Sequence, residues 1–406
     1  MSSAVTFRAD TDGVTDPIGF FAAAASADIR NKGDERLDTG VVYSKHPCAA
    51  AGVFTKNAVK AAPVLDCERV LKLRKAIHGV VANSGNANAC TGTQGIADSL
   101  AMLRTAESAS DSPEDSFLVC STGRIGDLLP MQRITPVIKS VSERARDGEK
   151  EGTPFAESIL TSDTRKKTCT ASFEVGGKTV TIGGAAKGAG MIQPDMATML
   201  AFITTDIAAD SGDLQKLLRE TVKHTFNAIT VDGDMSTNDT VLVLANGQSG
   251  VSLDADSVDL VRDALSQVCD CLADKIVADG ERITKVVEIL VSGAASDRDA
   301  ENISRAIGNS LLVKTSWYGN DPNWGRLMDA LGYAEAQIDQ YVIDISYDDV
   351  PALVSGNPIP ENKPKWKEVV SKPRFSIKID LHQGEGSFRL RASDLTEGYV
   401  DFNKSE

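Results

Sequence analysis

Short apolar runs alternate with glycine- and asparagine-bearing turns over residues 1 to about 130. Runs such as GVVYS, AGVFT and AIHGVVAN are typical of strands bounded by turns. Two segments with helical periodicity, CERVLKLRKAI and GIADSLAMLRTAESA, lie among them. The charged stretch SERARDGEKEGTPFAES, residues 142–158, contains Gly and Pro and predicts a solvated connection.

From about residue 159 the pattern changes. TASFEVGGKTVTIGGAAKG predicts a hairpin that turns at Gly176-Gly177. A strand in MATMLAFITTDI follows, and then two helical patterns, SGDLQKLLRETVKHTFNAI and SVDLVRDALSQVCDCLADKIV. KVVEILVSG predicts another strand, and ENISRAIGNSLLVKTS predicts a helix.

The last block, from about residue 330, is rich in strand patterns (YVIDISYDD, RFSIKIDL and FRLRASD). GNPIPENKPKWKE interrupts it, and its prolines predict an irregular loop. Strands followed by paired helices predict an α/β (α+β) protein, in which helices are layered over mixed sheets.

Composition and charge narrow the class of protein. The 406 residues are 42% hydrophobic and 25% charged, as in soluble globular proteins, and no apolar run approaches the roughly 20 residues of a membrane span. The net charge of -14 argues against nucleic acid or an anionic membrane as a partner. The amino-terminal residues lack a secretory signal and the seven cysteines are scattered, so we expect reduced thiols and a cytoplasmic location.

The common catalytic motifs are missing. None of the four histidines stands in HExxH or beside GxSxG, and no Walker A motif occurs, which disfavours serine-triad, zinc and nucleotide-binding enzymes. VDGDMSTND, residues 231–239, lacks glycine at position 6 of a calcium loop and lacks the closing bidentate Glu, so we expect a turn with Asx hydrogen bonds and no metal. ANSGNANACTG, residues 82–92, predicts tight polar turns with left-handed backbone, of a kind that can line a pocket.

One remaining candidate is Thr198, which stands at the start of a buried strand pattern in KGAGMIQPDMATMLAFITTD. A Thr hydroxyl is a weak nucleophile without a neighbouring base. The α-amino group of the same residue, with a pKa of about 7.7, would serve if Thr198 were a chain terminus. For that, the Thr198 hydroxyl would have to attack the Ala197 carbonyl, so that the acyl group shifts from nitrogen to oxygen and forms an ester. Water would then hydrolyse the ester and release the new amino terminus. The residues alone favour the simpler alternative of an ordinary strand threonine.

A series of longer motifs runs in order along nearly the whole chain. They are DPIGFFAAAASADIR, AGVFTKNAVKAAPV, VANSGNANACTG, STGRIG, TSDTRKK, the block around Thr198, FNAITVDGDMSTNDT, ADGERITK, VKTSWYGNDPNWGR and SDLTEGYVDFN. With this series the chain resembles the ornithine acetyltransferase (glutamate N-acetyltransferase) family of arginine biosynthesis, whose members process themselves at a threonine. The resemblance implies a layered sandwich built from two self-cleaved chains, 1–197 and 198–406, the second of which carries the strand-rich lobe from about residue 330.

The resemblance also implies the roles of the site residues. Thr198 would be the nucleophile and a new amino terminus, and Thr122 and Gly123 in STGRIG would form the oxyanion hole. Without the resemblance, STG would be interpreted as a turn after the FLVC strand. The implied substrate contacts are Thr161, Lys187, Thr198, Glu281 and Asn403.

Lys187 suits a substrate carboxylate, and Glu281 suits an amino group of ornithine. On residue pattern alone, Lys187 would be a solvated turn residue and Glu281 a surface charge. Ser162 and Thr164 lie close enough to Thr161 in the sequence to take its place.

Two positions depart from the family pattern. The family closes with an asparagine followed by several residues that end in Ser or Thr, and Asn403 matches that asparagine. The printed sequence then stops at Glu406, so either Ser405 supplies the final hydroxyl, or that contact is absent, or residues have been trimmed. Arg124 stands where an apolar residue is expected and places a charge next to the implied oxyanion donors.

The implied reaction moves acetyl from N2-acetyl-L-ornithine to L-glutamate through an acetyl-Thr198 intermediate, with no metal or organic cofactor. Acetyl-CoA as a second donor stays open. The implied assembly is an α/β heterodimer from one precursor, in a heterotetramer or larger. Two alternatives also stay open: a self-processing aminopeptidase or amidohydrolase that uses water as acceptor, and an inactive paralogue that binds an amino acid through Lys187 and Glu281.

Overall fold

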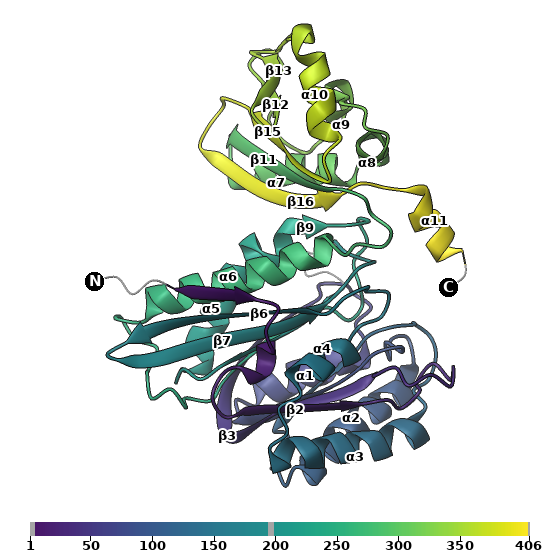
Figure 1. The fold of residues 1–406 in the computed structure, drawn as a ribbon, viewed down its shortest axis with the longest axis vertical. Helices are drawn as coiled ribbons and strands as arrows, with labels where there is room; N and C mark the ends of the chain where they lie inside the picture. The colour runs from purple at the N-terminus through teal and green to yellow at the C-terminus, as the bar shows by residue number, and fades with distance from the viewer. Residues whose placement is uncertain (1–4, 194–198, 405–406) are drawn as a thin grey trace. The chain divides into compact units, whose positions relative to one another are not determined.

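The computed structural model describes residues 5–193 and 199–404. The chain divides into two compact units (Figure 1). Among the described residues, unit 1 comprises 5–188, 199–227 and 235–276, and unit 2 comprises 189–193, 228–234 and 277–404. Each unit combines helices with its own mixed sheet, so the predicted fold class is confirmed.

Unit 1 is organised around a nine-stranded sheet in the order β1-β6-β7-β8-β10-β3-β4-β5, with β2 paired to β3. Its strands are β1 (Thr6–Ala9), β2 (Phe20–Ala25), β3 (Thr39–Phe54), β4 (Ile77–Asn83), β5 (Phe117–Ser121), β6 (Lys167–Val175), β7 (Lys178–Lys187), β8 (Leu200–Thr205) and β10 (Thr240–Ala245). The pairs β8–β10 and β4–β5 are parallel and the other pairs are antiparallel.

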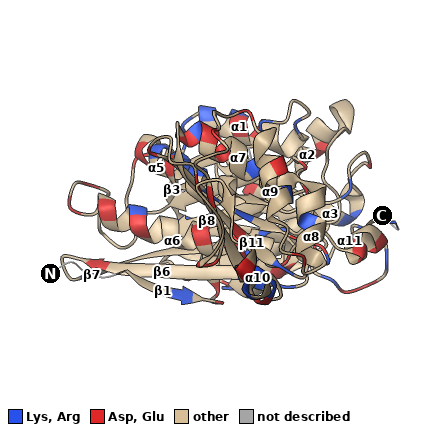
Figure 2. Ribbon diagram, turned by 90° about the horizontal axis from the view of Figure 1, so that it is seen from above, with Lys and Arg blue, Asp and Glu red and all other residues tan. Residues whose placement is uncertain are grey.

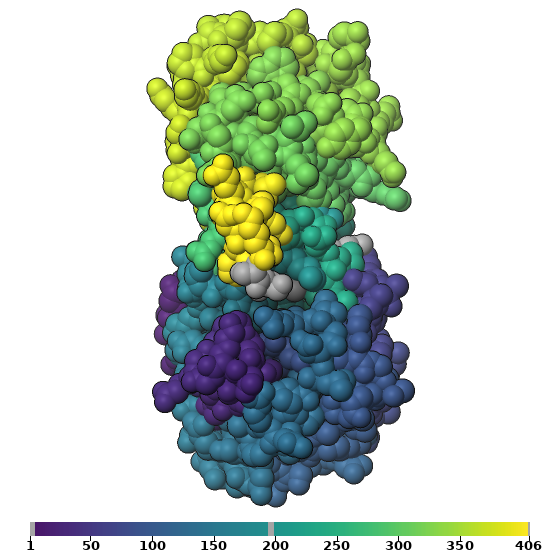
Figure 3. All heavy atoms as spheres, turned by 90° about the vertical axis from the view of Figure 1, so that its right-hand side faces the viewer, coloured from purple at the N-terminus to yellow at the C-terminus, as the bar shows by residue number. Residues whose placement is uncertain are grey.

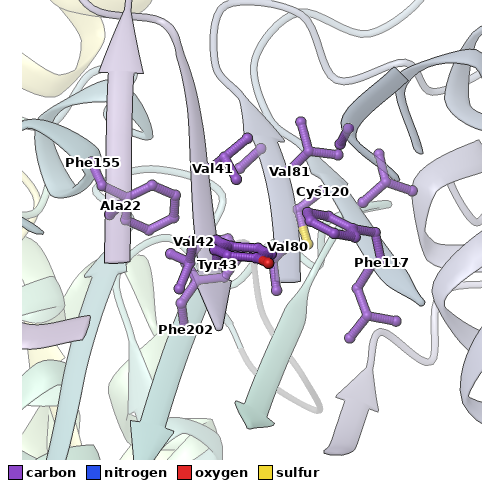
Figure 4. Close-up of a cluster of buried hydrophobic side chains, with 14 of the residues drawn as sticks. Ala22, Val41, Val42, Tyr43, Val80, Val81, Phe117, Cys120, Phe155 and Phe202 are labelled. Carbon is purple, nitrogen blue, oxygen red and sulfur yellow. The ribbon is translucent and has the colours of Figure 1, made fainter. Parts of the chain in front are cut away.

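The long strand β3 joins the two halves of this sheet. Residues 39–44 pair with β2, residues 49–54 pair with β10, and the register with β4 shifts between Tyr43 and Cys48. Apolar side chains of β2 to β5 form the core shown in Figure 4, where Tyr43 stacks on Phe117 with ring centroids 6.5 Å apart. Phe155 meets Phe202 edge to face at 5.2 Å, which ties a helix to strand β8.

The helices of unit 1 bury one apolar face each. They are α1 (Ala62–Lys72), α2 (Gly92–Ala109), α3 (Met131–Asp147), α4 (Gly152–Ser158), α5 (Ser211–His224) and α6 (Val258–Val277), the last residue of which falls in unit 2. Figure 2 shows acidic and basic residues interspersed along α5, whose leucines face inward. Helix α6 packs against β6 and β7. Cys169 Sγ of β6 donates to the Val268 carbonyl of α6, and Gly184 of β7 leaves room for the Leu272 side chain of α6.

The prediction of a solvated connection at 142–158 is wrong. The end of α3 and all of α4 occupy this stretch, and Ala145 and Phe155 are completely buried. Helical periodicity places the buried residues on one face and the charges on the other. Arg144 bridges Glu149 and Glu151 at 2.8 and 2.7 Å, and Gly148, with φ of 110°, ends α3.

Unit 2 holds a seven-stranded sheet in the order β14-β13-β12-β15-β11-β16-β9. Its strands are β9 (Ile229–Thr230), β11 (Val286–Ala294), β12 (Asp344–Tyr347), β13 (Val350–Val354), β14 (Asn357–Pro358), β15 (Arg374–Asp380) and β16 (Gly386–Ser393). Its helices are α7 (Asp297–Asn309), α8 (Leu311–Tyr318), α9 (Trp324–Gly332), α10 (Lys363–Val370) and α11 (Glu397–Asn403). Helix α11, yellow in Figure 3, has no buried residue.

The prediction of an irregular loop in GNPIPENKPKWKE is wrong. Strand β14 and the first part of α10 lie in this segment, with a 3₁₀ turn at Pro360–Asn362 between them. Pro364 occupies the first turn of α10, where the backbone N–H that proline lacks would have no helical partner. Trp366 is buried, and its indole N–H donates to the Pro351 carbonyl at 3.0 Å.

Most other elements follow the predicted pattern. The hairpin turns at Gly176 and Gly177, with φ of 57° and 77°, and the strand after residue 198 is β8. The helix predicted at ENISRAIGNSLLVKTS is instead two helices, α7 and α8, separated at Ser310. Within the described part of the chain, no helix is both long and apolar enough to cross a membrane.

Candidate active site

The loop after strand β5 carries Thr122 and Gly123 and is held against the asparagine-rich turn of unit 1. The Thr122 N–H donates to the Asn83 carbonyl at 3.0 Å, and the Thr122 side chain is buried. Gly123 has φ of 134°, and a Cβ there would overlap the backbone of Gly85 and Asn86. The STG sequence therefore forms a turn that requires glycine at position 123.

The asparagine-rich turn is buried and supports this loop. Asn83, Asn86 and Asn88 are all buried. The Ser121 hydroxyl donates to Asn83 Oδ1 at 2.6 Å, and the Asn83 amide donates to the Asn86 carbonyl at 3.0 Å. Asn88 and Cys90 have φ of 47° and 57°, which confirms the left-handed backbone.

Arg124 lies at the surface. Its backbone carbonyl accepts from the Ala87 N–H at 2.8 Å, while the residue is exposed to solvent. The charge that departs from the family pattern therefore stays out of the buried part of the loop.

A second polar cluster of unit 1 joins Thr161 and Lys187. Lys187 is the last residue of β7 and is 2% exposed, so the interpretation as a solvated turn residue is wrong. Its Nζ donates to Thr161 Oγ1 at 2.7 Å and lies 3.8 Å from Asp163 Oδ2. Lys187 therefore contacts the predicted Thr161 as well as Asp163.

Asp163 organises this cluster, and sequence reasoning did not single it out. Its carboxylate accepts from Lys167 Nζ at 2.6 Å, from the Gly188 N–H at 2.7 Å and from the Thr161 N–H at 3.0 Å. Burial alone would raise the pKa of Asp163, but Lys187, Lys167 and the Gly188 N–H together lower it well below its ordinary value. The ionised carboxylate thus fixes both the Thr161 backbone and the Lys187 ammonium group.

Residues 238 and 239 form a third part of the site that sequence reasoning missed. The Asn238 amide donates to the Ala87 and Ser121 carbonyls at 2.6 and 2.8 Å, next to Thr122. Asp239 Oδ1 accepts from the Met199 N–H at 3.0 Å. Two adjacent side chains thus connect the loop of Thr122 and Gly123 with the residue that follows Thr198.

Ala197, Thr198 and Ser405 lie outside the described residues. The described neighbour Met199 is buried, and strand β8 begins after it at Leu200, which pairs with Lys187 of β7. Lys187 therefore lies on the adjacent strand, directly beside the beginning of β8.

Glu281 and Asn403 are brought together within unit 2. The Asn403 amide donates to Glu281 Oε2 at 3.2 Å, and the Glu281 N–H donates to the Ala189 carbonyl at 3.0 Å. Glu281 also packs so tightly on Gly190 that a Cβ there would overlap its carboxylate. Glu281 is thus half-buried and constrained, in contrast to the interpretation as a free surface charge.

The 231–239 segment contains the predicted Asx turn. Asp232 accepts from the N–H groups of Met191, Ile192 and Asp234 at 2.6, 2.8 and 3.2 Å. Both oxygens of the Asp232 carboxylate therefore accept from backbone N–H groups. In the part of the chain that the structure describes, no group of three or more His, Cys, Asp or Glu residues is arranged to hold a metal.

The glycine-dependent turn at Gly123, the buried cluster around Lys187 and the buried Asp239 all belong to unit 1. A family model described as the ArgJ family matches residues 21–405. The Arginine biosynthesis bifunctional protein ArgJ of Symbiobacterium thermophilum is 45% identical over 396 residues, which are 97% of this chain and 98% of that protein. The protein of the same name from Oceanobacillus iheyensis is 40% identical over 395 residues, 97% of this chain and 95% of its own.

Among solved structures, the Arginine biosynthesis bifunctional protein argJ of Bacillus halodurans is 37% identical, with a TM-score of 0.49 over 50% of this chain and 98% of that chain. The chain belongs to the ArgJ family. This confirms the resemblance to arginine-biosynthesis acetyltransferases and the prediction of an acyltransferase enzyme.

Proposed function

We propose that the chain transfers acetyl from N2-acetyl-L-ornithine to L-glutamate, after it has cleaved itself between Ala197 and Thr198. Family membership supports the reaction class. The observation that carries the residue assignment is the bridge made by Asn238 and Asp239, which bond to Ser121 and to Met199. Ser121 directly precedes the proposed oxyanion donor Thr122, and Met199 directly follows the proposed nucleophile.

In the proposed mechanism the α-amine of Thr198 takes the proton of its own hydroxyl as Oγ attacks the acetyl carbonyl. The Thr122 hydroxyl and the Gly123 N–H stabilise the oxyanion. The C–N bond breaks, the proton passes to the ornithine amine, and an acetyl ester remains on Thr198. The amine of glutamate then attacks this ester, and N-acetylglutamate leaves as the hydroxyl is restored.

Lys187 is the proposed contact for the carboxylate that acetylornithine and glutamate share. A buried ammonium group held by Asp163 and Thr161 is preorganised for such a contact, because its geometry is already fixed. Thr161 is proposed to bind the same group, and Glu281, Asn403 and, where it reaches, Ser405 are proposed as further substrate contacts.

The proposal extends to the assembly and the donor. Fragments 1–197 and 198–406 would form an α/β heterodimer, in a heterotetramer or larger, and acetyl-CoA is a second donor to be tested in the same assay. A cytoplasmic location accompanies this proposal.

Intact-mass measurement of the purified protein tests the proposal. We expect two fragments. The 198–406 fragment should begin Thr-Met-Leu-Ala by Edman degradation, and it should carry one acetyl group when N-acetylornithine is given without glutamate. Thr198→Ala should stay whole and inert. A fully active unbroken chain contradicts the proposal.

The same assay separates the alternatives. Acetyl release that needs no glutamate would favour an amidohydrolase, in which water is the acceptor. An uncut wild-type chain that binds glutamate without turnover would favour an inactive amino-acid-binding paralogue.

A further inference from the structure

Cys169 of strand β6 and Cys271 of helix α6 bring two thiols together inside unit 1. Cys169 is directly opposite Gly184 in the β6–β7 pair, so both positions face the same side of the sheet. A Cβ at Gly184 would meet the side chains of Val268 and Leu272, which shows that α6 covers this side. Cys169 therefore points at the helix that carries Cys271.

Two polar contacts fix the part of α6 that lies over Cys169. Cys169 Sγ lies 3.4 Å from the Val268 carbonyl oxygen, and Lys275 Nζ donates to the Thr168 carbonyl at 2.8 Å. Residues 268, 271 and 275 are spaced i, i+3 and i+7, so they share one face of the helix. Cys271 thus lies between two contacts that are made beside Cys169, and the two thiols are within hydrogen-bonding distance of each other.

The two thiols differ in exposure and in charge. Cys169 is completely buried, whereas Cys271 is partly exposed. The hydrogen bond from the Cys169 thiol is the largest effect that lowers the pKa of Cys271, and the charge of Lys275 adds to it. Burial and the carboxylates of Asp274 and Asp10 oppose this lowering of the pKa without cancelling it. The contact with Cys271 and burial raise the pKa of Cys169, so this residue keeps its proton.

We propose that Cys169 and Cys271 are a peroxide-reactive thiol pair that forms a reversible disulfide bond. The Cys271 thiolate attacks one oxygen of hydrogen peroxide and breaks the O–O bond, which leaves a sulfenic acid on Cys271; the departing hydroxide takes up a proton and becomes water. The Cys169 sulfur then attacks the Cys271 sulfur, and its proton leaves with the hydroxyl group as a second water. Two thiols have lost two electrons, and the peroxide has been reduced to two molecules of water.

The disulfide bond joins the two fragments of the proposed cleavage, because Cys169 belongs to 1–197 and Cys271 belongs to 198–406. The oxidised enzyme is therefore held together covalently as well as by its shared sheet. Formation of the bond does not depend on cleavage, since the two thiols also meet in the uncut chain. A reducing environment keeps both thiols free, in agreement with the expectation from the sequence, and peroxide changes that state.

Cys67 and Cys120 provide a comparison within the same unit. Their thiols also contact each other, but both residues are buried and both belong to fragment 1–197. Burial raises the pKa of Cys120 well above its ordinary value. We expect these two cysteines to stay reduced, because peroxide reacts with exposed thiolates.

The test treats the purified, cleaved enzyme with a small molar excess of hydrogen peroxide and blocks the remaining thiols with N-ethylmaleimide. On a denaturing gel without reductant we expect one band at the size of the uncut chain, which dithiothreitol converts into the two fragments. Peptide mapping should recover a bond between Cys169 and Cys271. Two bands without reductant, or a map in which Cys67 and Cys120 are bonded instead, overturns the proposal.

Serine variants show which thiols make the link. Cys169→Ser and Cys271→Ser should each give two bands after peroxide. Cys90→Ser is the matched control, because Cys90 is exposed and lies in the opposite fragment from Cys271, where a random bond between molecules would use it. This variant should keep the single band. A single band in Cys271→Ser, or its loss in Cys90→Ser, contradicts the assignment.

Dimedone, which labels sulfenic acids, separates the two roles. Cys169→Ser should be labelled at Cys271 after peroxide, because the sulfenic acid has no second thiol to react with, whereas Cys271→Ser should not be labelled at Cys169. The reverse pattern overturns the proposal. Mapping of the wild-type chain needs no variant, so it decides the question even where a serine variant does not fold.

The uncut chain separates this proposal from the proposed function. Thr198→Ala should form the same bond on peroxide treatment, which peptide mapping detects within one chain. If the wild-type chain is not cut before Thr198, the proposed function fails, and mapping of that chain still shows whether Cys169 and Cys271 are bonded. Absence of the bond from a chain that is cut normally overturns the thiol pair alone.

Discussion

Gly123 adopts a backbone conformation in which its neighbours leave no room for a side chain. Its φ of 134° and the close backbone of Gly85 and Asn86 mean that a methyl group would force the loop apart. We expect Gly123→Ala to reduce acetyl transfer by about 100-fold or more, because a displaced oxyanion donor no longer points at the developing charge. The measurement is kcat/KM for acetyl transfer, made on whatever fraction of the chain has been cleaved.

Gly126 in the same loop is the control for this prediction. It also has positive φ, 96°, but a Cβ there meets nothing within 4 Å. Gly126→Ala should lose about 1 kcal/mol of unfolding free energy and keep its activity. If Gly123→Ala and Gly126→Ala were equally active, the backbone of Gly123 would have no role in catalysis.

At the scale of single residues, the sequence alone favoured Thr198 as an ordinary strand residue, and the family motifs assigned the catalytic roles. The sequence did not assign these roles to Asp163, Asn238 or Asp239, because important partners of each are far away in the chain: the Gly188 N–H that bonds to Asp163 is 25 residues from it. Lys187 and Thr161 are 26 residues apart, Met199 and Asp239 are 40 apart, and Asn238 and Ser121 are 117 apart. A buried acidic residue can be predicted from a sequence only when its hydrogen-bond partner is known, and identifying that partner requires the order of the strands in the sheet.

At the scale of elements, Ser310 divides a helical pattern into α7 and α8. Its backbone leaves the helical region, with φ of -65° and ψ of 115°, and its hydroxyl accepts from the Val313 N–H at 3.3 Å as the cap of α8. We expect Ser310→Ala to lower the free energy of unfolding by about 1 kcal/mol, since one donor of the first turn loses its partner. Urea denaturation followed by circular dichroism measures this.

Ser371→Ala provides the comparison for Ser310→Ala. The Ser371 hydroxyl donates to the Lys367 carbonyl at 2.6 Å at the end of α10, and the residue is exposed. Its loss should change stability by less than about 0.5 kcal/mol. A loss at Ser310 no larger than at Ser371 would mean that the hydroxyl does not stabilise the start of α8.

The elements that the sequence predicted well have one dominant signal each. Paired glycines predicted the hairpin at Gly176-Gly177, and regular apolar spacing predicted α2 and α6. Two of the errors came from composition. By composition alone, the charges at 142–158 and the prolines at 356–368 oppose helix formation, but Arg144 pairs with acidic neighbours and Pro364 lies in a first turn that tolerates it. In both segments, whether a charged residue or a proline is compatible with a helix depends on its position in that helix, and composition does not give this position.

At the scale of the whole molecule, the proposed cleavage would divide the chain without dividing the sheet of unit 1. Strands β1 to β7 precede residue 198, while β8 and β10 follow it. The strand order places β8 and β10 between β7 and β3, so each fragment contributes strands to one continuous sheet. β8 pairs with β7 over residues 200–205, and β10 pairs with β3 over residues 240–245.

The cleaved enzyme should therefore behave as one particle under native conditions. Separation of the fragments would expose two rows of unpaired backbone groups and the apolar faces of Phe202 and Leu242, which are part of one core cluster. We expect the fragments to elute together in gel filtration, at the position of uncut Thr198→Ala, and to part only at denaturant concentrations that also abolish the circular dichroism of unit 1. Fragments that separate in buffer alone would contradict this sheet order. To separate, they would have to break the backbone hydrogen bonds of the β7–β8 and β10–β3 pairs.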